Sequence, residues 1–376
     1  MSNNNNAKDI NDLRQKGIDP LSVPLEEVGG DRPETDLEGA PILRWKGADP
    51  DWWTENVPPR EWLVRAGNTE EAPGYIPRGE VGILAGRGAT GKTWALVALA
   101  LAVATGKEWL GYRTAPRGGR GRVALLVAEE TGDEVRRRVR AQADMMDIRL
   151  ADLAGRIVVL DRSDMVDGAA LVTEETWQPT PFGLKVFASL RTEAKTGGDW
   201  DLVILDPLSA FGPPDCETDN AAATYTMREV ERLCSLPGSP TVLVAHHTKK
   251  GRKEAGEGAD MDDIRGASGL VYRARWAASL SKAGEAGEDR YLRLEVVKGN
   301  YGPAVSPLVY VQPGLLPHNG RQNRKACGAI RAASDDDLLR LKAPEEKAEA
   351  EKQRKKQAAP PAPAAPSKAG RGTFGG

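Results

Sequence analysis

The sequence predicts an α/β protein in which a mostly parallel β-sheet is flanked by helices. Three observations predict this fold class: short continuous apolar runs, amphipathic segments of helical length between them, and a glycine-rich loop after the first run. Runs of four or five apolar residues are typical of strands buried on both faces of a parallel sheet. Strands that alternate with helices form βαβ units, in which neighbouring strands run parallel.

The expected strands and helices follow one another in a regular order. An apolar run at residues 81–85 predicts the first buried strand, and residues 94–102 predict the helix after it. Further strands are expected at residues 123–127, 157–160, 202–205 and 242–245. Helices are expected near residues 133–145, 181–194 and 221–236. After residue 265, strands expected at 274–281, 290–297 and 308–312 lack intervening helices, which predicts antiparallel edge strands at the C-terminal side.

One core with an extension at each end is the expected domain organisation. Residues 1–40 are polar and interrupted by Pro and Gly, so we expect them to be disordered. Residues 41–78 form an arm that we expect to pack on the core or on a neighbouring subunit, with stacking on nucleic-acid bases as the alternative. This arm is rich in tryptophan and contains Trp45, Trp52, Trp53 and Trp62. The core is expected at residues 79–315. Residues 316–376 are charged and then rich in Ala, Pro and Gly, which predicts a flexible tail.

Composition excludes several classes of protein. The 376 residues carry 52 Lys and Arg against 54 Asp and Glu, a net charge of -2, so any nucleic-acid surface must be local. Cys216, Cys234 and Cys327 have no paired spacing, which indicates neither a zinc site nor a disulfide framework. No apolar run has the length of a membrane span, and the polar N-terminus does not resemble a signal peptide. We therefore expect a soluble, cytoplasmic protein without membrane partners.

The glycine-rich loop matches the pattern GxxxxGK[ST]. It consists of Gly86, Arg87, Gly88, Ala89, Thr90, Gly91, Lys92 and Thr93. Its glycines allow backbone N–H groups to surround a phosphate at the start of a helix, where the helix dipole also favours an anion. Lys92 is placed to contact the β- and γ-phosphates, and the Thr93 hydroxyl to ligate Mg²⁺. The strand before the loop and the helix after it make a chance match improbable, so we expect the cofactors ATP and Mg²⁺.

Carboxylates follow two of the expected strands, at the sheet edge where open α/β sheets bind ligands. Asp206 ends the strand at 202–205 and is placed to hold Mg²⁺ through water; capping of the next helix is the alternative. Glu129 and Glu130 follow the strand at 123–127, where a carboxylate can orient the water that attacks the γ-phosphate. A solvated acidic turn is the alternative for this pair.

Two histidines and a basic loop follow the strand at 242–245. A polar side chain such as His246 or His247 at this position can sense the γ-phosphate, whereas a structural role is the alternative. Metal ligation by the pair is not expected, because adjacent residues on a strand point to opposite faces. The basic loop that follows predicts a contact with nucleic-acid phosphates, against the alternative of a solvated charged loop. Its basic residues are Lys249, Lys250, Arg252 and Lys253. The loop at residues 209–220 is expected to line the same opening.

Taken together, these clusters resemble the RecA-like hexameric ATPases, and within them the RepA-type replicative helicases of plasmids and phages. The resemblance covers about residues 62–313, and only the phosphate loop is specific by itself. The matching segments are residues 86–93, 128–130, 205–208, 246–249, 265–268, 273–276 and 298–302. The N-terminal arm and the C-terminal tail have no counterpart in this family, and no primase or zinc-binding module is seen.

The resemblance implies a role for several side chains. Glu129 corresponds to the catalytic glutamate, Asp206 to the Mg²⁺-associated aspartate and His247 to the γ-phosphate sensor. Arg275 corresponds to an arginine finger that reaches the nucleotide of a neighbouring subunit, with Arg273 and Arg265 as nearby alternatives and a purely structural role as another. Lys298 and Asn300 fall on a strand motif found near the subunit interface. Lys92 acts on the phosphates as in every phosphate-loop enzyme.

The implied function is that of a ring-forming DNA motor, most closely a replicative helicase. The expected partners are single-stranded DNA, further copies of the chain in a hexamer, and replication proteins that bind the tails. A recombination or repair ATPase of RecA or RadA type uses the same core as a filament and remains an alternative. A further alternative is an ATP-dependent regulator or loader that does not unwind DNA. Polarity, ring size and the preferred DNA structure are not determined by the sequence.

Overall fold

The computed structural model describes two units, which are considered separately: Met1–Pro59 and Arg60–Gly376. The described residues are 46, 50–67, 69–165, 168–248, 264, 268–283, 291–301, 309–316 and 327–339. In the first unit, the short helix α2 (Asp51–Thr54) carries Trp52 and Trp53, whose rings meet edge to face with centroids 4.5 Å apart. Both rings are exposed within the described residues, and Trp45 lies outside them.

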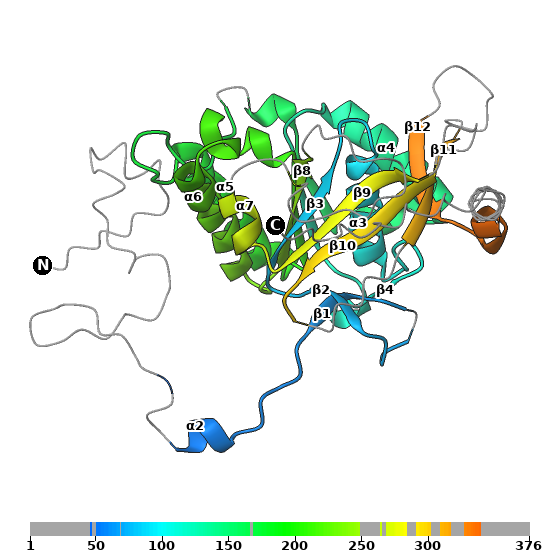
Figure 1. Ribbon diagram of the computed structural model, residues 1–376, viewed down its shortest axis with the longest axis horizontal. Coiled ribbons are helices and arrows are strands. Elements are labelled where there is room, and N and C mark those ends of the chain that lie inside the picture. The colour runs from blue at the N-terminus through cyan, green and yellow to red at the C-terminus, as the bar shows by residue number, and fades with distance from the viewer. Residues whose placement is uncertain are drawn as a thin grey trace, which may run out of the picture. The chain divides into compact units, whose positions relative to one another are not determined.

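A nine-stranded sheet forms the centre of the second unit as described (Figure 1). Its strands follow the order β12-β11-β10-β9-β3-β8-β7-β5-β6. The six strands from β9 to β6 are parallel: β9 (Trp276–Ala283), β3 (Val81–Gly86), β8 (Thr241–His247), β7 (Leu202–Asp206), β5 (Val123–Val127) and β6 (Ile157–Leu160). Antiparallel pairing adds β10 (Tyr291–Gly299), β11 (Val309–Leu316) and β12 (Cys327–Ala332) beside β9. The predicted α/β fold, with antiparallel strands on the C-terminal side, is confirmed.

Helices cover both faces of the sheet because its strands are apolar on both faces. On one face, α3 (Lys92–Thr105) and α4 (Gly132–Met145) pack with Leu84 of β3 in one hydrophobic cluster. On the other face, α5 (Pro181–Gly197), α6 (Asn220–Arg232) and α7 (Ser268–Arg273) pack with Ile83, the preceding residue of the same strand. Figure 1 shows the two groups of helices on opposite sides of β3 and β8. Adjacent residues of one strand thus pack into two different hydrophobic clusters, because successive side chains of a strand point to opposite faces of the sheet.

Shorter elements connect these helices and strands. A three-stranded sheet of order β2-β1-β4 contains β1 (Trp62–Arg65), β2 (Gly74–Pro77) and β4 (Arg113–Thr114). Single 3₁₀ turns lie at Arg117–Gly119, Leu150–Leu153, Arg162–Met165, Leu208–Ala210, Pro214–Glu217 and Leu233–Ser235. Among the residues described, no helix combines the length and the apolar character needed to cross a membrane.

The core is larger at both ends than residues 79–315, the range that the sequence predicts. At the N-terminal end, β1 and β2 belong to the second unit. At the C-terminal end, β12 lies in the segment expected to be a flexible tail. The side-chain amide of Gln142 on α4 holds this strand, since its Nε2 donates to the Ile330 carbonyl and its Oε1 accepts from the Ile330 N–H, both at 2.9 Å. These two residues are 188 positions apart, so no local pattern in the sequence reveals the contact.

A buried carboxylate joins the amino ends of the parallel strands. Asp201, directly before β7, accepts hydrogen bonds from Arg78 Nη1 at 2.8 Å and from the backbone N–H groups of Arg117 and Arg122, each at 3.1 Å. Arg78 also donates to the Ala115 carbonyl at 2.9 Å. Both side chains of the Arg78–Asp201 pair are buried. Because a buried charge is costly without its partner, this pair fixes the register of the loops that lead into β3, β5 and β7.

Replacement of Asp201 by Ala is expected to lower the free energy of unfolding by about 3 kcal/mol, because it leaves the buried Arg78 guanidinium without its buried partner. Urea denaturation followed by circular dichroism measures the change. Asp199→Ala, two residues away at an exposed position, is the matched control and is expected to change stability by less than about 0.5 kcal/mol. Equal effects of the two variants would show that the buried pair does not stabilise the fold.

Candidate nucleotide-binding site

The phosphate loop and the residues at the ends of three further strands, Glu129, Asp206 and His247, meet at the carboxyl edge of the parallel strands. The pairing of β3 with β8 places Gly86 opposite His247, and the pairing of β5 with β7 places Val127 opposite Asp206. Two backbone hydrogen bonds extend this alignment past the strand ends. The Ala128 N–H donates to the Asp206 carbonyl at 2.9 Å, and the Thr248 N–H donates to the Gly86 carbonyl at 3.3 Å. The ends of β5 and β7 therefore lie level with each other, as do the ends of β3 and β8, and all four are at the same edge of the sheet.

The phosphate loop is shaped to receive an anion. Gly91 has a φ of 88°, a left-handed conformation that favours glycine, and it precedes α3 without a side-chain hydrogen bond that caps the helix. The N–H groups of the first helical turn are thus left for a ligand. A Cβ added at Gly88 would meet no atom within 4 Å, so the space beside this residue is open. Thr90 stabilises the turn, since its Oγ1 donates to the Arg87 carbonyl at 2.8 Å.

Lys92 is folded back against the loop. Its Nζ donates to the carbonyl oxygens of Gly86 and Arg87 at 2.9 and 3.1 Å. Burial lowers the pKa of Lys92, while the negative charges of Asp206 and Glu129 act in the opposite direction. The ammonium group therefore lies inside the loop in a poorly solvated position, where added phosphate charge is strongly favourable.

Thr93 and Asp206 form the edge of the site where Mg²⁺ would lie. The Thr93 Oγ1 donates to Asp206 Oδ2 at 2.6 Å. Burial raises the pKa of Asp206, and the Thr93 hydrogen bond and the charge of Lys92 lower it in part. A hydroxyl and a carboxylate are the hard oxygen donors that Mg²⁺ prefers, so these residues fit the ion. In the described part of the chain, no three His, Cys, Asp or Glu side chains could hold a metal together.

Glu129 and Glu130, of which the family resemblance points to Glu129, have different surroundings in the structure. Glu130 pairs with Arg138 of α4, and Arg138 also contacts Glu134 at 3.2 Å. Glu129 is exposed at the same edge, and its charge acts on both Lys92 and Asp206. One carboxylate is therefore held by a helix while the other faces the loop. The sequence analysis did not single out Arg138; Glu130 lies before α4, so no helical spacing links the two residues in the sequence.

The two histidines occupy different environments at the end of β8. His246 is buried, at 1% exposure, whereas His247 is partly exposed beside the first residue of the phosphate loop. Alternation along the strand causes this difference. The four basic residues expected to contact DNA follow directly but lie outside the described residues: Lys249, Lys250, Arg252 and Lys253.

Arg275 lies at the opposite, amino edge of the sheet. It precedes β9, and its backbone N–H donates to the carbonyl of Val81, the first residue of β3, at 2.8 Å. Lys298 is close by, since the charge of Arg275 contributes to lowering the pKa of Lys298, after burial. The Lys298 Nζ donates to the Val271 carbonyl at 2.8 Å, and the Asn300 N–H donates to the Arg275 carbonyl at 3.1 Å.

The surroundings of Arg275 and Lys298 include residues to which the sequence analysis assigned no role. The Tyr301 hydroxyl donates to Glu80 Oε1 at 2.7 Å, and the Arg60 guanidinium lies 3.5 Å from the centroid of the Tyr301 ring. Tyr301 belongs to the expected strand motif at residues 298–302, whereas Arg60 and Glu80 come from distant segments that only the fold brings together.

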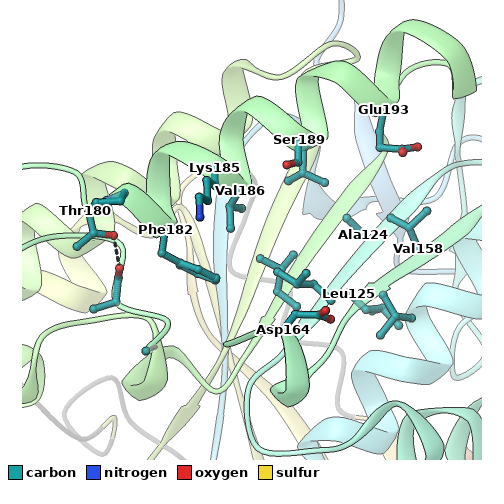
Figure 2. Close-up of a pocket in the computed structure, with 17 residues that line it drawn as sticks. Ala124, Leu125, Val158, Asp164, Thr180, Phe182, Lys185, Val186, Ser189 and Glu193 are labelled. Carbon is teal, nitrogen blue, oxygen red and sulfur yellow. Dashed lines mark hydrogen bonds between the residues drawn. The ribbon is translucent and has the colours of Figure 1, made fainter. Parts of the chain in front are cut away.

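A separate hollow lies between α5 and the strands β5 and β6 (Figure 2). Its volume is about 890 Å³, and most of its lining is apolar, including Leu125, Val158 and Phe182. Lys185 and Glu193 of α5 stand at its rim in the close-up. None of the predicted site residues lines this hollow, so it is separate from the site at the phosphate loop.

One family profile matches the part of the chain that contains this site. The sequence profile of a family described as an AAA domain matches residues 40–253, more than half of the chain. The matched range contains the phosphate loop, Glu129, Asp206 and His247. The family accounts for ATP binding and hydrolysis of the phosphate-loop class, which usually involves Mg²⁺. The chain belongs to the AAA domain family and is a phosphate-loop ATPase.

Proposed function

We propose that this ATPase is a ring-forming DNA motor, a replicative helicase of the RepA type. The observation that carries the proposal is the separation of Arg275 from the phosphate loop of its own chain. Arg275 is bonded to Val81 and the loop begins at Gly86, so the two stand about 17 Å apart at ~3.3 Å per strand residue. An arginine at this distance acts on the nucleotide of a neighbouring subunit. A closed ring provides such a neighbour at every subunit interface.

Hydrolysis follows from the charges at the carboxyl edge. Glu129 orients the attacking water, because it is exposed beside Lys92 and Asp206 while Glu130 is paired with Arg138. Lys92 turns from the loop carbonyls to the phosphates, and Arg275 of the adjacent subunit stabilises the charge that develops in the transition state. Thr93 and Asp206 would hold Mg²⁺, whose positive charge would neutralise part of the phosphate charge.

One continuous segment supports a link between nucleotide and DNA. It starts at His247 beside the phosphate loop, passes the basic residues at 249–253, and continues through α7 to Arg275. A γ-phosphate contact at His247 thus acts on both a DNA-binding loop and the residue that reaches the neighbour. A hexamer, a cytoplasmic location and tails that bind replication proteins belong to the same proposal.

A RecA- or RadA-type filament is the second candidate, because a filament also places Arg275 against a neighbouring loop. Strand displacement separates the two, since a ring helicase releases a labelled strand processively and a recombination filament or a regulatory switch does not.

Substitutions in the phosphate loop and at the proposed catalytic carboxylate are expected to have different effects on ATP binding and hydrolysis. Lys92→Ala should weaken ATP binding and abolish turnover, because it removes the charge that faces the phosphates. Glu129→Gln should keep ATP binding and slow hydrolysis by a factor of about 10² or more, because only the water-orienting carboxylate is removed. Calorimetric binding and phosphate release measure the two effects, and Glu130→Gln is the control expected to retain activity. Native turnover by Glu129→Gln would assign the role to another residue.

Single-stranded DNA is expected to stimulate ATP turnover, and strand displacement is expected on a forked duplex. Replacement of Lys249, Lys250, Arg252 and Lys253 by Ala should weaken binding for every DNA sequence, since phosphate contacts carry no sequence information. The slope of log affinity against log salt should flatten by about 0.7 for each DNA phosphate that is no longer neutralised. An unchanged slope would place the DNA elsewhere, for example at the basic residues 352–356, and the absence of any DNA binding would refute the motor.

Subunits with complementary defects are expected to restore activity together. Arg275→Ala should bind ATP but hydrolyse it roughly 10³-fold more slowly, because the trans charge is absent. Mixing it with Lys92→Ala should return part of the turnover, since some interfaces then combine an intact loop with an intact arginine. Native mass spectrometry confirms mixed assembly. Mixed assemblies without turnover at any ratio would exclude a shared site.

A further inference from the structure

Trp94 connects the phosphate loop to β12. It follows Thr93 in the first turn of α3 and is only partly buried, although it packs against the core. One edge of its six-membered ring lies at Gly91, where an added Cβ would be 3.1 Å from Trp94 Cε3. The opposite edge lies against β12, where a Cβ added at Gly328 would overlap the ring. The indole is thus held between the turn of the loop and a strand far along the sequence.

The position of Trp94 places it on the nucleoside side of the site. Side chains of a helix tilt toward its N-terminus, so the Trp94 side chain projects toward the loop. Lys92 reaches the β- and γ-phosphates, whereas backbone N–H groups along the loop and the start of the helix bind the α- and β-phosphates. The ribose and base therefore leave the loop at the first turn of α3, which carries Trp94.

We propose that Trp94 is a nucleoside-binding residue, whose indole contacts the base of the triphosphate held in the loop. An aromatic ring is suited to this task because every nucleobase has a π-face, and a rigid indole loses little entropy on contact. The ring is already fixed in the free protein by Gly91 and Gly328. Preorganisation of this kind gives affinity without an ordering cost at the moment of binding.

The strand β12 then has a role in nucleotide binding although it contains no phosphate contact. Gly328 leaves space for the ring, and the two hydrogen bonds between Gln142 and Ile330 fix the strand two residues further on. Gln142 belongs to α4, the helix that follows Glu129. Replacement of Gly328 by Ala would therefore displace the indole without altering the phosphate loop itself.

The test compares a nucleotide with its phosphates alone. This proposal rests on the nucleotide site described above, so affinities for a non-hydrolysable ATP analogue and for inorganic tripolyphosphate are both measured by calorimetry with Mg²⁺. Trp94→Leu should weaken binding of the ATP analogue about tenfold or more and leave tripolyphosphate binding within about twofold. Trp94→Phe should retain most of the affinity for the analogue, because it keeps an aromatic face. Gly328→Ala should reproduce the selective weakening.

The controls distinguish a base contact from a structural defect. Trp53→Leu removes an exposed tryptophan of the first unit and should change neither affinity, and thermal melting establishes that each variant is folded. Equal weakening for both ligands in Trp94→Leu, or no weakening for either, would overturn the proposal. If the native protein binds neither ligand, the assignment of the nucleotide site is wrong. If the native protein binds both ligands and Trp94→Leu has no selective effect, only the role of Trp94 is wrong.

Discussion

The in-register parallel pairing of β5, β7, β8 and β3 is the constraint on which the rest of the structure depends. Each strand contributes its chemistry in the residues that follow its last apolar position, and parallel pairing brings these ends to the same edge of the sheet. A shift of one residue in β7 would exchange its two faces, burying Asp206 in the wrong core and separating it from Thr93. The buried Arg78–Asp201 pair opposes such a shift from the other edge of the sheet.

In the protein without nucleotide, the charged groups of Lys92 and Asp206 occupy positions that a bound nucleotide and its cation would stabilise. Lys92 is buried and bonded to neutral carbonyls, and its pKa is lowered, while burial raises the pKa of Asp206. Both shifts report unfavourable solvation of the charged forms. Phosphate beside Lys92 and a cation beside Asp206 would each relieve this cost, so part of the binding free energy is stored in the arrangement of the loop.

The strands on the C-terminal side of the sheet carry several residues of the proposals made above. The turn into β9 carries Arg275 at the amino end of the sheet, with Lys298 of β10 beside it. Further along the same sheet, Gly328 of β12 contacts Trp94 beside the phosphate loop, and Ile330 of β12 is hydrogen-bonded to Gln142 of α4. These strands therefore connect the carboxyl edge, where ATP is proposed to react, with the edge proposed to face a neighbour.

The sequence by itself determined the parallel core and the phosphate loop, because buried strands and GxxxxGK[ST] are local patterns. The expected strand at 123–127 and the helix at 133–145 agree with β5 and α4 to within one residue. Only the tertiary structure showed that Glu130 is paired with Arg138 of α4. It also decided that residues 327–332 belong to the sheet and that Arg275 stands far from its own loop. Both facts arise from contacts between residues distant in the chain, for which a local pattern carries no signal.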